Sequence, residues 1–363
     1  MTQPLYNFSP GPAMLPVPVM EQVQREWLDF QGTGVSIVEL SHRGPVFSQL
    51  IEDVQTLFRE ISRLPDSHSI LFMHGGAQMQ FSAVPLNLIA MKPARNAQYV
   101  VSGKWGRLAE QEGHKYGNTS VMLDGSDSKY TRLPEWDTSR INPEASYVHI
   151  TTNDTLYGTQ WPEIPDSGDI PLVADATSDI LSRKVDYSRF GVLFAGLQKN
   201  LGPPGLALVI VCNELLGHAL PETPKLLDYS LCRQERSLMN TTNTFAVYVM
   251  KLVLEWLKDE GGVEEMERRN ARKSARLYKI LDHSGFYLPI AYPEHRSHMN
   301  VTFHLPSDEL LQRFLSEANT AGLYSVRGHS EVGGIRASIY NPMPYEGVDA
   351  LAQFMIEFER RNG

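Results

Sequence analysis

The sequence predicts an α/β protein in which helices cover both faces of a mainly parallel sheet. Three observations lead to this prediction. Short apolar runs recur along the chain up to about residue 211, and segments with a helical apolar pattern separate several of them. Most of these runs end in polar or glycine-rich turns, as strands do where the chain crosses over to a helix. A smaller region follows, in which charged helices and half-polar strands alternate.

Size and composition are those of an ordinary globular protein. The chain has 363 residues, 42% of them hydrophobic and 21% charged, which is enough for a large core and two or three domain-sized units. Its formal charge of −9 argues against a nucleic-acid partner, because phosphate backbones require a basic face. No apolar run approaches the roughly 20 residues that span a bilayer, so we expect no membrane partner.

Two further patterns concern location and metals. The first six residues hold neither a basic nor an apolar stretch, so no signal peptide is expected. The only cysteines, Cys212 and Cys232, lack zinc-type spacing, and Cys212 ends an apolar run that predicts a core position. We therefore expect a cytoplasmic protein with reduced thiols and without a metal site.

Two helices follow an irregular start. Residues 1–16 contain turn-forming serine, glycine and proline and predict neither helix nor strand. Apolar residues then recur at helical spacing from Pro18 to Phe30, and proline is favoured in a first helical turn. Glycines end this helix, and Pro45 is predicted to begin the next one.

Six apolar runs predict the strands of the sheet. Helical patterns lie between several of them, which is the strand–helix–strand order that leads to parallel pairing. The runs are residues 70–73, 99–101, 146–150, 171–175, 191–194 and 206–211.

A change of composition sets the C-terminal part of the chain apart. Residues 246–258 predict a mostly apolar connecting helix. After Gly261 and Gly262 the next helix is far more charged, and residues 299–304 alternate between apolar and polar as a half-exposed strand does. We predict a smaller α+β domain from about residue 260.

Two strand ends carry the residues that point most directly to a function. Lys199 follows the run at residues 191–194, and Asp175 ends the run at residues 171–175. Ligands of α/β proteins bind at this edge of the sheet. Such a pair suits pyridoxal phosphate, since the lysine can form a Schiff base and the aspartate can face the pyridine nitrogen. Taken singly, a solvated lysine and a helix-capping aspartate are the alternatives.

Other strand-end residues fit the same ligand. Small residues at Gly75, Gly76 and Ala77 would let backbone N–H groups approach a phosphate, although a plain tight turn would have the same sequence. Trp105 follows another strand and is placed to stack on a cofactor ring, with a core tryptophan as the alternative. Thr155 follows a further strand and either binds a ring hydroxyl or is an ordinary loop threonine.

Two arginines are candidates for binding an anionic substrate. Arg43 lies in a polar loop, and Arg336 lies in a strand-like run of small and apolar residues, where a guanidinium needs an anionic partner. A substrate carboxylate is one such partner, and an internal salt bridge is the other. His42 and His329 lie near these arginines in the sequence, but loop histidines are usually only solvated.

Six stretches of the chain resemble the phosphoserine aminotransferases, a class V group of the fold-type I pyridoxal-phosphate enzymes. The likeness extends from about residue 5 to the C-terminus. It implies a large domain with a mainly parallel seven-stranded sheet at residues 17–260, a small α+β domain at residues 261–363, and an N-terminal segment, residues 1–16, associated with the small domain. The stretches are residues 7–13 (NFSPGPA), 41–43 (SHR), 74–77 (HGGA), 195–203 (AGLQKNLGP), 240–242 (NTT) and 333–341 (GGIRASIYN).

The resemblance also implies roles for the candidate residues around the cofactor. Lys199 would hold pyridoxal phosphate as a Schiff base and move the proton, and Asp175 would keep the pyridine nitrogen protonated. Trp105 would stack on the ring and Thr155 would bind its hydroxyl. The cofactor phosphate would be held by Gly76, Ala77 and Gln198, and by Asn240 and Thr241 of the partner subunit in a homodimer.

For the substrate, the resemblance implies Ser9, Arg43 and Arg336, with Arg336 on the α-carboxylate and His42 and His329 near the phosphate. The implied reaction is transamination of 3-phosphohydroxypyruvate with L-glutamate, giving O-phospho-L-serine and 2-oxoglutarate in serine biosynthesis. Some relatives also act on the phosphorylated threonine analogue of pyridoxine biosynthesis.

The chain departs from some relatives near the substrate phosphate. Gln78 and Ser330 stand where those relatives have arginines. Arg327 is a candidate replacement for the missing cation, and a solvated Arg327 is the alternative.

Two other classes of function are compatible with such a fold. One is another fold-type I enzyme, such as a cysteine desulfurase or an alanine–glyoxylate-type transaminase. A desulfurase needs a reactive cysteine, whereas Cys212 is predicted to be buried and Cys232 has no activating neighbour. The other class is a binding protein that keeps the fold without the cofactor.

Overall fold

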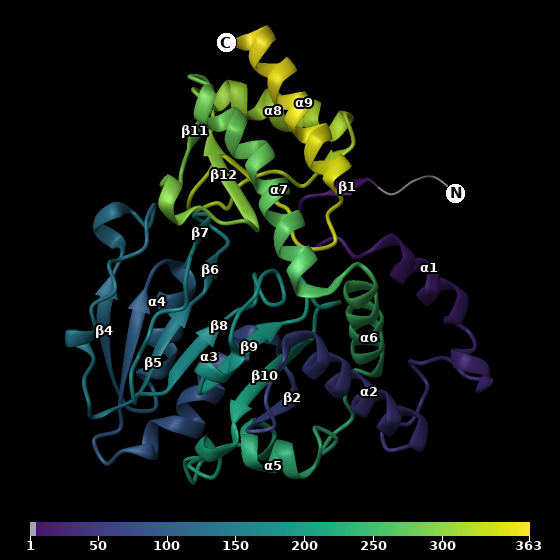
Figure 1. Cartoon of the computed structure of the whole chain (residues 1–363), viewed down its shortest axis with the longest axis vertical. Helices are drawn as coiled ribbons and strands as arrows, with labels where there is room; N and C mark the ends of the chain where they lie inside the picture. Colours follow the sequence, from purple (N-terminus) through teal and green to yellow (C-terminus); the bar gives the residue numbers. More distant parts are fainter. Residues whose placement is uncertain (1–4) are drawn as a thin grey trace.

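The computed structural model describes residues 5–363 and shows a large sheet with helices on both faces below a smaller unit that carries the C-terminus (Figure 1). Residues 1–4, which belong to the stretch expected to lack a signal peptide, lie outside the described residues. No helix within residues 5–363 is both long enough and apolar enough to cross a membrane.

The large sheet has seven strands, in the order β2-β10-β9-β8-β5-β3-β4. The pairs β9–β8, β8–β5, β5–β3 and β3–β4 are parallel, whereas β10 runs antiparallel to both of its neighbours. The predicted fold class, a mainly parallel seven-stranded α/β sheet, is therefore confirmed. The strands are β2 (His68–His74), β3 (Asn96–Val101), β4 (Asn118–Asp124), β5 (Ala145–Thr151), β8 (Leu172–Asp175), β9 (Val192–Gly196) and β10 (Leu206–Cys212).

Central strands of the sheet are buried on both faces. Along β9, Leu193 and Ala195 belong to one hydrophobic core, and Val192 and Phe194 belong to another, because successive side chains point to opposite faces. The first core includes residues of α1 (Val17–Glu26), α2 (Pro45–Ser62) and α6 (Thr244–Asp259). The second includes residues of α3 (Gly76–Leu88), α4 (Lys104–Gly113) and α5 (Tyr229–Gln234).

The smaller unit is built on a second, antiparallel sheet with a core of its own. Its strands are β11 (Leu288–Pro289), β12 (Asn300–His304) and β14 (Ile335–Ser338), and its helices are α7 (Gly262–His283), α8 (Asp308–Thr320) and α9 (Tyr345–Asn362). Ser307 caps α8 by accepting a hydrogen bond from the Leu310 N–H at 3.2 Å.

The N-terminal segment joins this smaller unit. Strand β1 (Tyr6–Asn7) pairs with β13 (Leu323–Tyr324), and Phe8 is fully buried in the core of the unit. Residues after Phe8 then pass back toward the large sheet, as the N-terminal trace in Figure 1 shows. The irregular start predicted from the sequence thus includes one short strand, whose pairing depends on a distant segment.

Helix α7 connects the two cores. Its first turns contribute Val263 and Met266 to the core of the large sheet, and its later turns contribute Leu277 and Leu281 to the smaller core. Between them lies the buried Lys273, whose ammonium donates hydrogen bonds to three backbone carbonyls that follow β14. Figure 1 shows this helix, labelled α7, running obliquely from the smaller unit down to the large sheet.

Candidate active site

Lys199 lies in a tight turn directly after β9, at the carboxyl edge of the parallel strands. The N–H groups of Leu201 and Gly202 both donate to the Leu197 carbonyl, at 3.2 and 2.8 Å, and so close the turn. The N-terminal segment passes across it, because the Ala13 N–H donates to the Gln198 carbonyl at 2.9 Å. The turn is therefore fixed by the large sheet and by the segment that arrives from the smaller unit.

The Lys199 ammonium is buried among charged groups. Burial lowers the pKa of Lys199 to about 8, while the carboxylates of Asp175 and Asp154 act in the opposite direction and Arg336 adds to the lowering. Only 9% of the Lys199 surface is exposed, so water contributes little to its solvation. An amine with such a pKa exchanges protons readily near neutral pH.

Asp175 ends β8, the strand adjacent to β9. Its Oδ1 accepts a hydrogen bond from the Thr177 N–H at 3.0 Å, and the register places it beside Phe194 of β9. Burial raises the pKa of Asp175, and the hydrogen bonds from Thr177 and the charge of Lys199 oppose this rise. The predicted lysine–aspartate pair is therefore brought to neighbouring strand ends, in electrostatic contact.

A second carboxylate, which the sequence reasoning missed, belongs to the same cluster. Asp154 lies in a short hairpin made of β6 (Asn153–Asp154) and β7 (Thr159–Gln160), directly after β5. Its Oδ1 accepts the N–H groups of Leu156 at 2.8 Å and Tyr157 at 3.1 Å, while its Oδ2 is buried without a partner. Burial raises the pKa of Asp154 to about 6. The available signal was its place in the polar loop that follows the predicted strand at residues 146–150.

Arg336 comes from β14 of the smaller unit and is 6% exposed. Its Nη1 donates to the Thr155 carbonyl at 3.2 Å, and its Nε is buried without a partner. Burial lowers the pKa of Arg336, and Tyr340 and Asp154 oppose this effect. No carboxylate of residues 5–363 forms an ion pair with this guanidinium within 4.0 Å. The internal salt bridge considered as the alternative is therefore not formed, and the buried donor remains available to an anionic ligand.

Trp105 and Thr155 lie beside this cluster and are hydrogen-bonded to each other. Trp105 lies in the first turn of α4 and is half-buried, and its indole N–H donates to the Thr155 hydroxyl at 3.1 Å. Thr155 is buried and is also the residue whose carbonyl accepts the Arg336 guanidinium. The structure thus joins three of the predicted site residues through direct hydrogen bonds.

The glycine turn after β2 provides a helix N-terminus with free backbone groups. Gly75 and Gly76 have φ values of 90° and 64°, in the left-handed region that favours glycine. A Cβ built on Gly76 would meet no atom within 4 Å, so open space lies beside the first residues of α3. Such a helix start is suited to a phosphate. Gln198 is half-buried, and its side chain lies beside Gly196, the last residue of β9.

Arg43 and Asn240 lie near the glycine turn rather than in the Lys199 cluster. The exposed Arg43 donates from Nη2 to the Met239 carbonyl at 3.4 Å, and Asn240 lines a cavity of about 250 Å³ with Gly75 and Met79. Thr241 is exposed, and His42 is half-buried with an unpartnered Nε2. None of these residues forms a hydrogen bond or ion pair with Lys199, Asp175 or Arg336 among the described residues.

Ser9 and His329 flank the cluster from the smaller unit. The Ser9 N–H donates to Asn7 Oδ1 at 3.0 Å, and the next residue, Pro10, accepts the Tyr340 hydroxyl at 2.8 Å. His329 Nδ1 accepts the Glu331 N–H at 3.1 Å. Burial lowers the pKa of His329, and the charge of Lys104 adds to this effect.

Comparison with known proteins assigns the family. The model of the class V aminotransferases matches residues 5–351 of the chain. A phosphoserine aminotransferase from Laribacter hongkongensis is 48% identical over 360 residues, which is 99% of each chain. The solved phosphoserine aminotransferase from Bacillus circulans subsp. alkalophilus superposes with a TM-score of 0.96 at 39% identity, with all of both chains covered. The chain belongs to the class V aminotransferases.

Within this family, proteins named phosphoserine aminotransferases match the chain over nearly its whole length at 39 to 48% identity. A further solved example, from Trichomonas vaginalis, contains pyridoxal phosphate and has a TM-score of 0.92 at 30% identity, covering 97% of this chain and 99% of that one. The resemblance read from the six sequence stretches is thereby confirmed.

One of the two thiols, Cys232, does not suit desulfurase chemistry. Cys232 is buried, and burial raises its pKa to about 11, so it is a poor source of thiolate. Cys212 is half-buried at the end of β10, which corrects the prediction of a core position. The strand ends at this residue, so the side chain is only partly covered.

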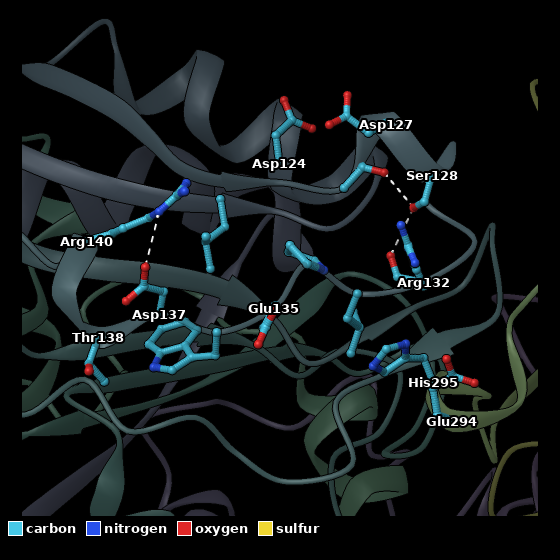
Figure 2. Close-up of a pocket in the computed structure, with 15 residues that line it drawn as sticks. Asp124, Asp127, Ser128, Arg132, Glu135, Asp137, Thr138, Arg140, Glu294 and His295 are labelled. Atoms are coloured by element: carbon cyan, nitrogen blue, oxygen red, sulfur yellow. Dashed lines mark hydrogen bonds and ion pairs between the residues drawn. The ribbon is translucent and has the colours of Figure 1, made fainter.

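A cavity of about 890 Å³ lies away from the Lys199 cluster (Figure 2). It is lined by the segment after β4 and by Glu294 and His295 of the smaller unit. Figure 2 shows Arg140 beside Asp137, with Nε 3.4 Å from Oδ2. Asp124, which also lines the cavity, forms an ion pair with Arg107, whose Nη2 lies 2.5 Å from Oδ2 of Asp124. The cavity contains none of the predicted site residues.

Proposed function

We propose that this aminotransferase uses pyridoxal phosphate to interconvert 3-phosphohydroxypyruvate and L-glutamate with O-phospho-L-serine and 2-oxoglutarate. The observation that carries the proposal is the cluster at the sheet edge. It holds a buried lysine with two carboxylates, Asp175 and Asp154, and the unpaired guanidinium of Arg336. The whole-chain relatives that are named phosphoserine aminotransferases support the same substrate.

The residues at this edge fit pyridoxal phosphate. Lys199 supplies a buried amine, Asp175 a buried carboxylate, Trp105 an aromatic face, and Gly76 with Ala77 the N-terminus of α3 for the phosphate. When bound, this cofactor acts as an electron sink that stabilises negative charge on the α-carbon of an amino acid. The buried Asp175 carboxylate would hold a proton on the ring nitrogen, which strengthens that effect.

Lys199 would move the proton between the α-carbon of the substrate and the cofactor. Its pKa of about 8 lies close to the pH of the cell, so the amine accepts and returns a proton without a large free-energy difference. Arg336 would bind the α-carboxylate, because its buried Nε has no partner within the described chain. Ser9, on the N-terminal segment beside the Lys199 turn, would bind the substrate from the other side.

We propose that the active sites are shared in a homodimer. Arg43 donates a hydrogen bond to the carbonyl of Met239, the residue that precedes Asn240. Neither Arg43 nor Asn240 contacts the Lys199 cluster of the same chain. Arg43, His42, Asn240 and Thr241 would therefore act at the cluster of the partner subunit. With His329, the first two would bind the distal phosphate of the substrate.

An exposed apolar surface supports this assembly. Among residues 5–363, seven of the fourteen exposed large apolar residues fall within residues 17–46, and Leu28 is 83% exposed. This segment contacts the chain around Asn240, since Trp27 packs edge-to-face on Phe245 at 5.5 Å and Thr244 donates to the Ile37 carbonyl at 2.8 Å. Apolar surface of this extent favours burial against a second copy.

We further propose a division into a large domain at residues 17–260 and a small domain at residues 261–363, with residues 1–16 belonging to the small one. The separate hydrophobic cores support it, and Phe8 lies in the second of them. Cytoplasmic location is proposed on the two free cysteines, Cys212 and Cys232, which persist as thiols in a reducing compartment.

The test is an assay of the complete reaction with the purified holoenzyme. Phosphoserine and 2-oxoglutarate should yield glutamate and 3-phosphohydroxypyruvate in equal amounts, and Lys199→Ala should abolish turnover by removing the Schiff-base amine and the proton carrier. Full turnover by Lys199→Ala without an added amine would refute the role of this lysine. Turnover of alanine with glyoxylate but not of phosphoserine would refute the substrate.

A further inference from the structure

Two positions near the distal phosphate of phosphoserine, which carry arginines in some relatives, are uncharged in this chain. Gln78 and Ser330 are uncharged, and Arg327 was the candidate replacement. Arg327 is exposed and donates from Nη2 to the side chain of Gln312 on α8, at 2.9 Å. The replacement role is therefore not supported, and the solvated alternative describes Arg327 better. A second cation beside Arg43 would therefore have to come from another part of the chain.

Lys104 is such a cation, and it lies at the site. It is the first residue of α4 and directly precedes Trp105, whose indole is bonded to Thr155. Its ammonium forms an ion pair with the carboxylate of Glu331, which belongs to the smaller unit. The Lys104 side chain is 26% exposed, whereas the Glu331 side chain is 48% exposed. Lys104 is therefore the more buried partner, and the Glu331 side chain is the one that can rotate away toward solvent.

The turn that carries Glu331 also carries His329 and leads into the strand of Arg336. The Glu331 N–H donates to His329 Nδ1 at 3.1 Å, and the Gly333 N–H donates to the His329 carbonyl at 2.7 Å. A bond of 2.8 Å from the Gly328 N–H to the Gly334 carbonyl closes the base of the turn, two residues before Arg336. The ion pair thus brings Lys104 to the turn that positions His329 and leads into Arg336.

We propose that Lys104 is a specificity-determining residue that binds the distal phosphate, and that Glu331 occupies its ammonium until the phosphate displaces it. This inference rests on the proposed function and names the cation missing from it. A phosphate with two negative charges competes with the single charge of Glu331 for Lys104 better than the γ-carboxylate of glutamate does. The exchange would therefore favour phosphoserine over glutamate.

The two partners of the ion pair predict opposite effects. Lys104→Gln should lower kcat/KM for phosphoserine by about 10- to 100-fold and for glutamate by less than about fivefold. Glu331→Gln should raise kcat/KM for phosphoserine by about two- to fivefold, because the competing carboxylate is gone. Inhibition of the holoenzyme by inorganic phosphate, measured as an inhibition constant, should weaken in the first variant and strengthen in the second.

Lys115→Gln is the matched control, because Lys115 pairs with Glu112 at the other end of α4 at 2.5 Å. It should leave both substrates within about twofold of wild type. Lys104→Arg, which keeps the charge, should restore most of the phosphoserine activity and shows that a loss in Lys104→Gln is not misfolding.

If the ion pair of Lys104 with Glu331 only stabilised the contact between the smaller unit and α4, the two variants would have other effects. Glu331→Gln would then lower kcat/KM for phosphoserine as Lys104→Gln does, and both variants would affect glutamate to the same extent. Either result overturns the proposal, as does an unchanged inhibition constant for phosphate in Lys104→Gln. Failure of the proposed function is seen separately, in the wild-type enzyme, as turnover of glutamate without turnover of phosphoserine.

Discussion

At the scale of single residues, the site depends on charges that are buried against one another. Lys199 has its pKa lowered to about 8 by burial, and Asp154 has its pKa raised to about 6 by the same cause. Arg336 compensates part of the negative charge without an ion pair. Each group is kept less stable in its charged form than it would be in water, which is the usual state of groups that bind or transfer charge in an active site.

Replacement of Asp175 tests the electron-sink role. In Asp175→Asn the cofactor should stay bound through Lys199 and the phosphate contacts, but the ring nitrogen loses the carboxylate that stabilises its proton. We expect kcat to fall by at least about 100-fold, which corresponds to about 2.7 kcal/mol in the transition state. Steady-state kinetics alongside the cofactor absorbance measures both effects. A variant within about threefold of wild type would show that another residue does this work.

Replacement of Asp154 tests its burial energetics. Because the folded-state pKa of Asp154 is raised from 3.8 to about 6, its contribution to stability is present below pH 4 and is lost as the pH rises through 6. Asp154→Asn keeps an acceptor for the two N–H groups and removes the titration. Relative to wild type, its gain in free energy of unfolding should be larger at pH 8 than at pH 5, by about 1 to 2 kcal/mol. Urea unfolding at the two pH values measures this, and an equal difference at both would contradict it.

Much of the site could be predicted at this scale, because its residues follow strands whose carboxyl ends meet at one edge. Lys199 and Asp175 are brought together in this way. Asp154 was missed, since nothing in the order Asn153-Asp154 shows that one carboxylate oxygen is left without a partner. The ion pair of Lys104 with Glu331 was also out of reach, because it joins residues 227 positions apart.

At the scale of elements, helix α7 connects the cores through one buried ammonium. Lys273 donates to the carbonyls of Ile339, Tyr340 and Met343 at 3.0, 2.7 and 3.1 Å. Burial lowers its pKa to about 7. These carbonyls lie just beyond β14, the strand that carries Arg336, so the contact fixes the end of that strand against α7.

Lys273→Met should therefore cost on the order of 2 to 5 kcal/mol of unfolding free energy, because three buried carbonyls lose their donor. Lys279→Met, at an exposed position of the same helix, is the control and should change stability by less than about 0.5 kcal/mol. Urea denaturation of both variants gives the comparison. Equal stability of the two would mean that the three hydrogen bonds contribute little.

Elements with a strong apolar pattern were predicted well, and those held only by distant partners were not. Pro45 begins α2, as expected, and the apolar runs at residues 171–175 and 206–211 are strands. Strand β4 was missed because it is an edge strand whose first four residues are partly exposed. Helix α1 ends at Glu26, short of the expected Phe30, and Phe30 instead begins a short 3-10 turn that buries its ring.

At the scale of the whole molecule, the proposed dimer links assembly to cofactor binding. Leu28→Asp should weaken the dimer, because it places a charge in the exposed apolar surface of residues 17–46. The affinity for pyridoxal phosphate should fall with it, as Asn240 and Thr241 of the partner subunit would be withdrawn. Sedimentation and cofactor titration over a dilution series measure the two effects.

Ile356→Asp is the control for this variant, since Ile356 is 44% exposed on α9 of the smaller unit. It should leave both the assembly and the cofactor affinity unchanged. A monomer of Leu28→Asp that binds pyridoxal phosphate as tightly as the wild-type dimer would contradict the shared site.

The half-reaction of the holoenzyme tests the central claim most directly. The protein with pyridoxal phosphate is mixed with one amino acid at a time, without any keto acid, and the cofactor absorbance is followed. Phosphoserine and glutamate should each convert the cofactor to its amine form in a single turnover, with the matching keto acid released, while alanine and serine should react far more slowly. Faster conversion by alanine or serine than by phosphoserine would contradict the assignment of phosphoserine as the substrate.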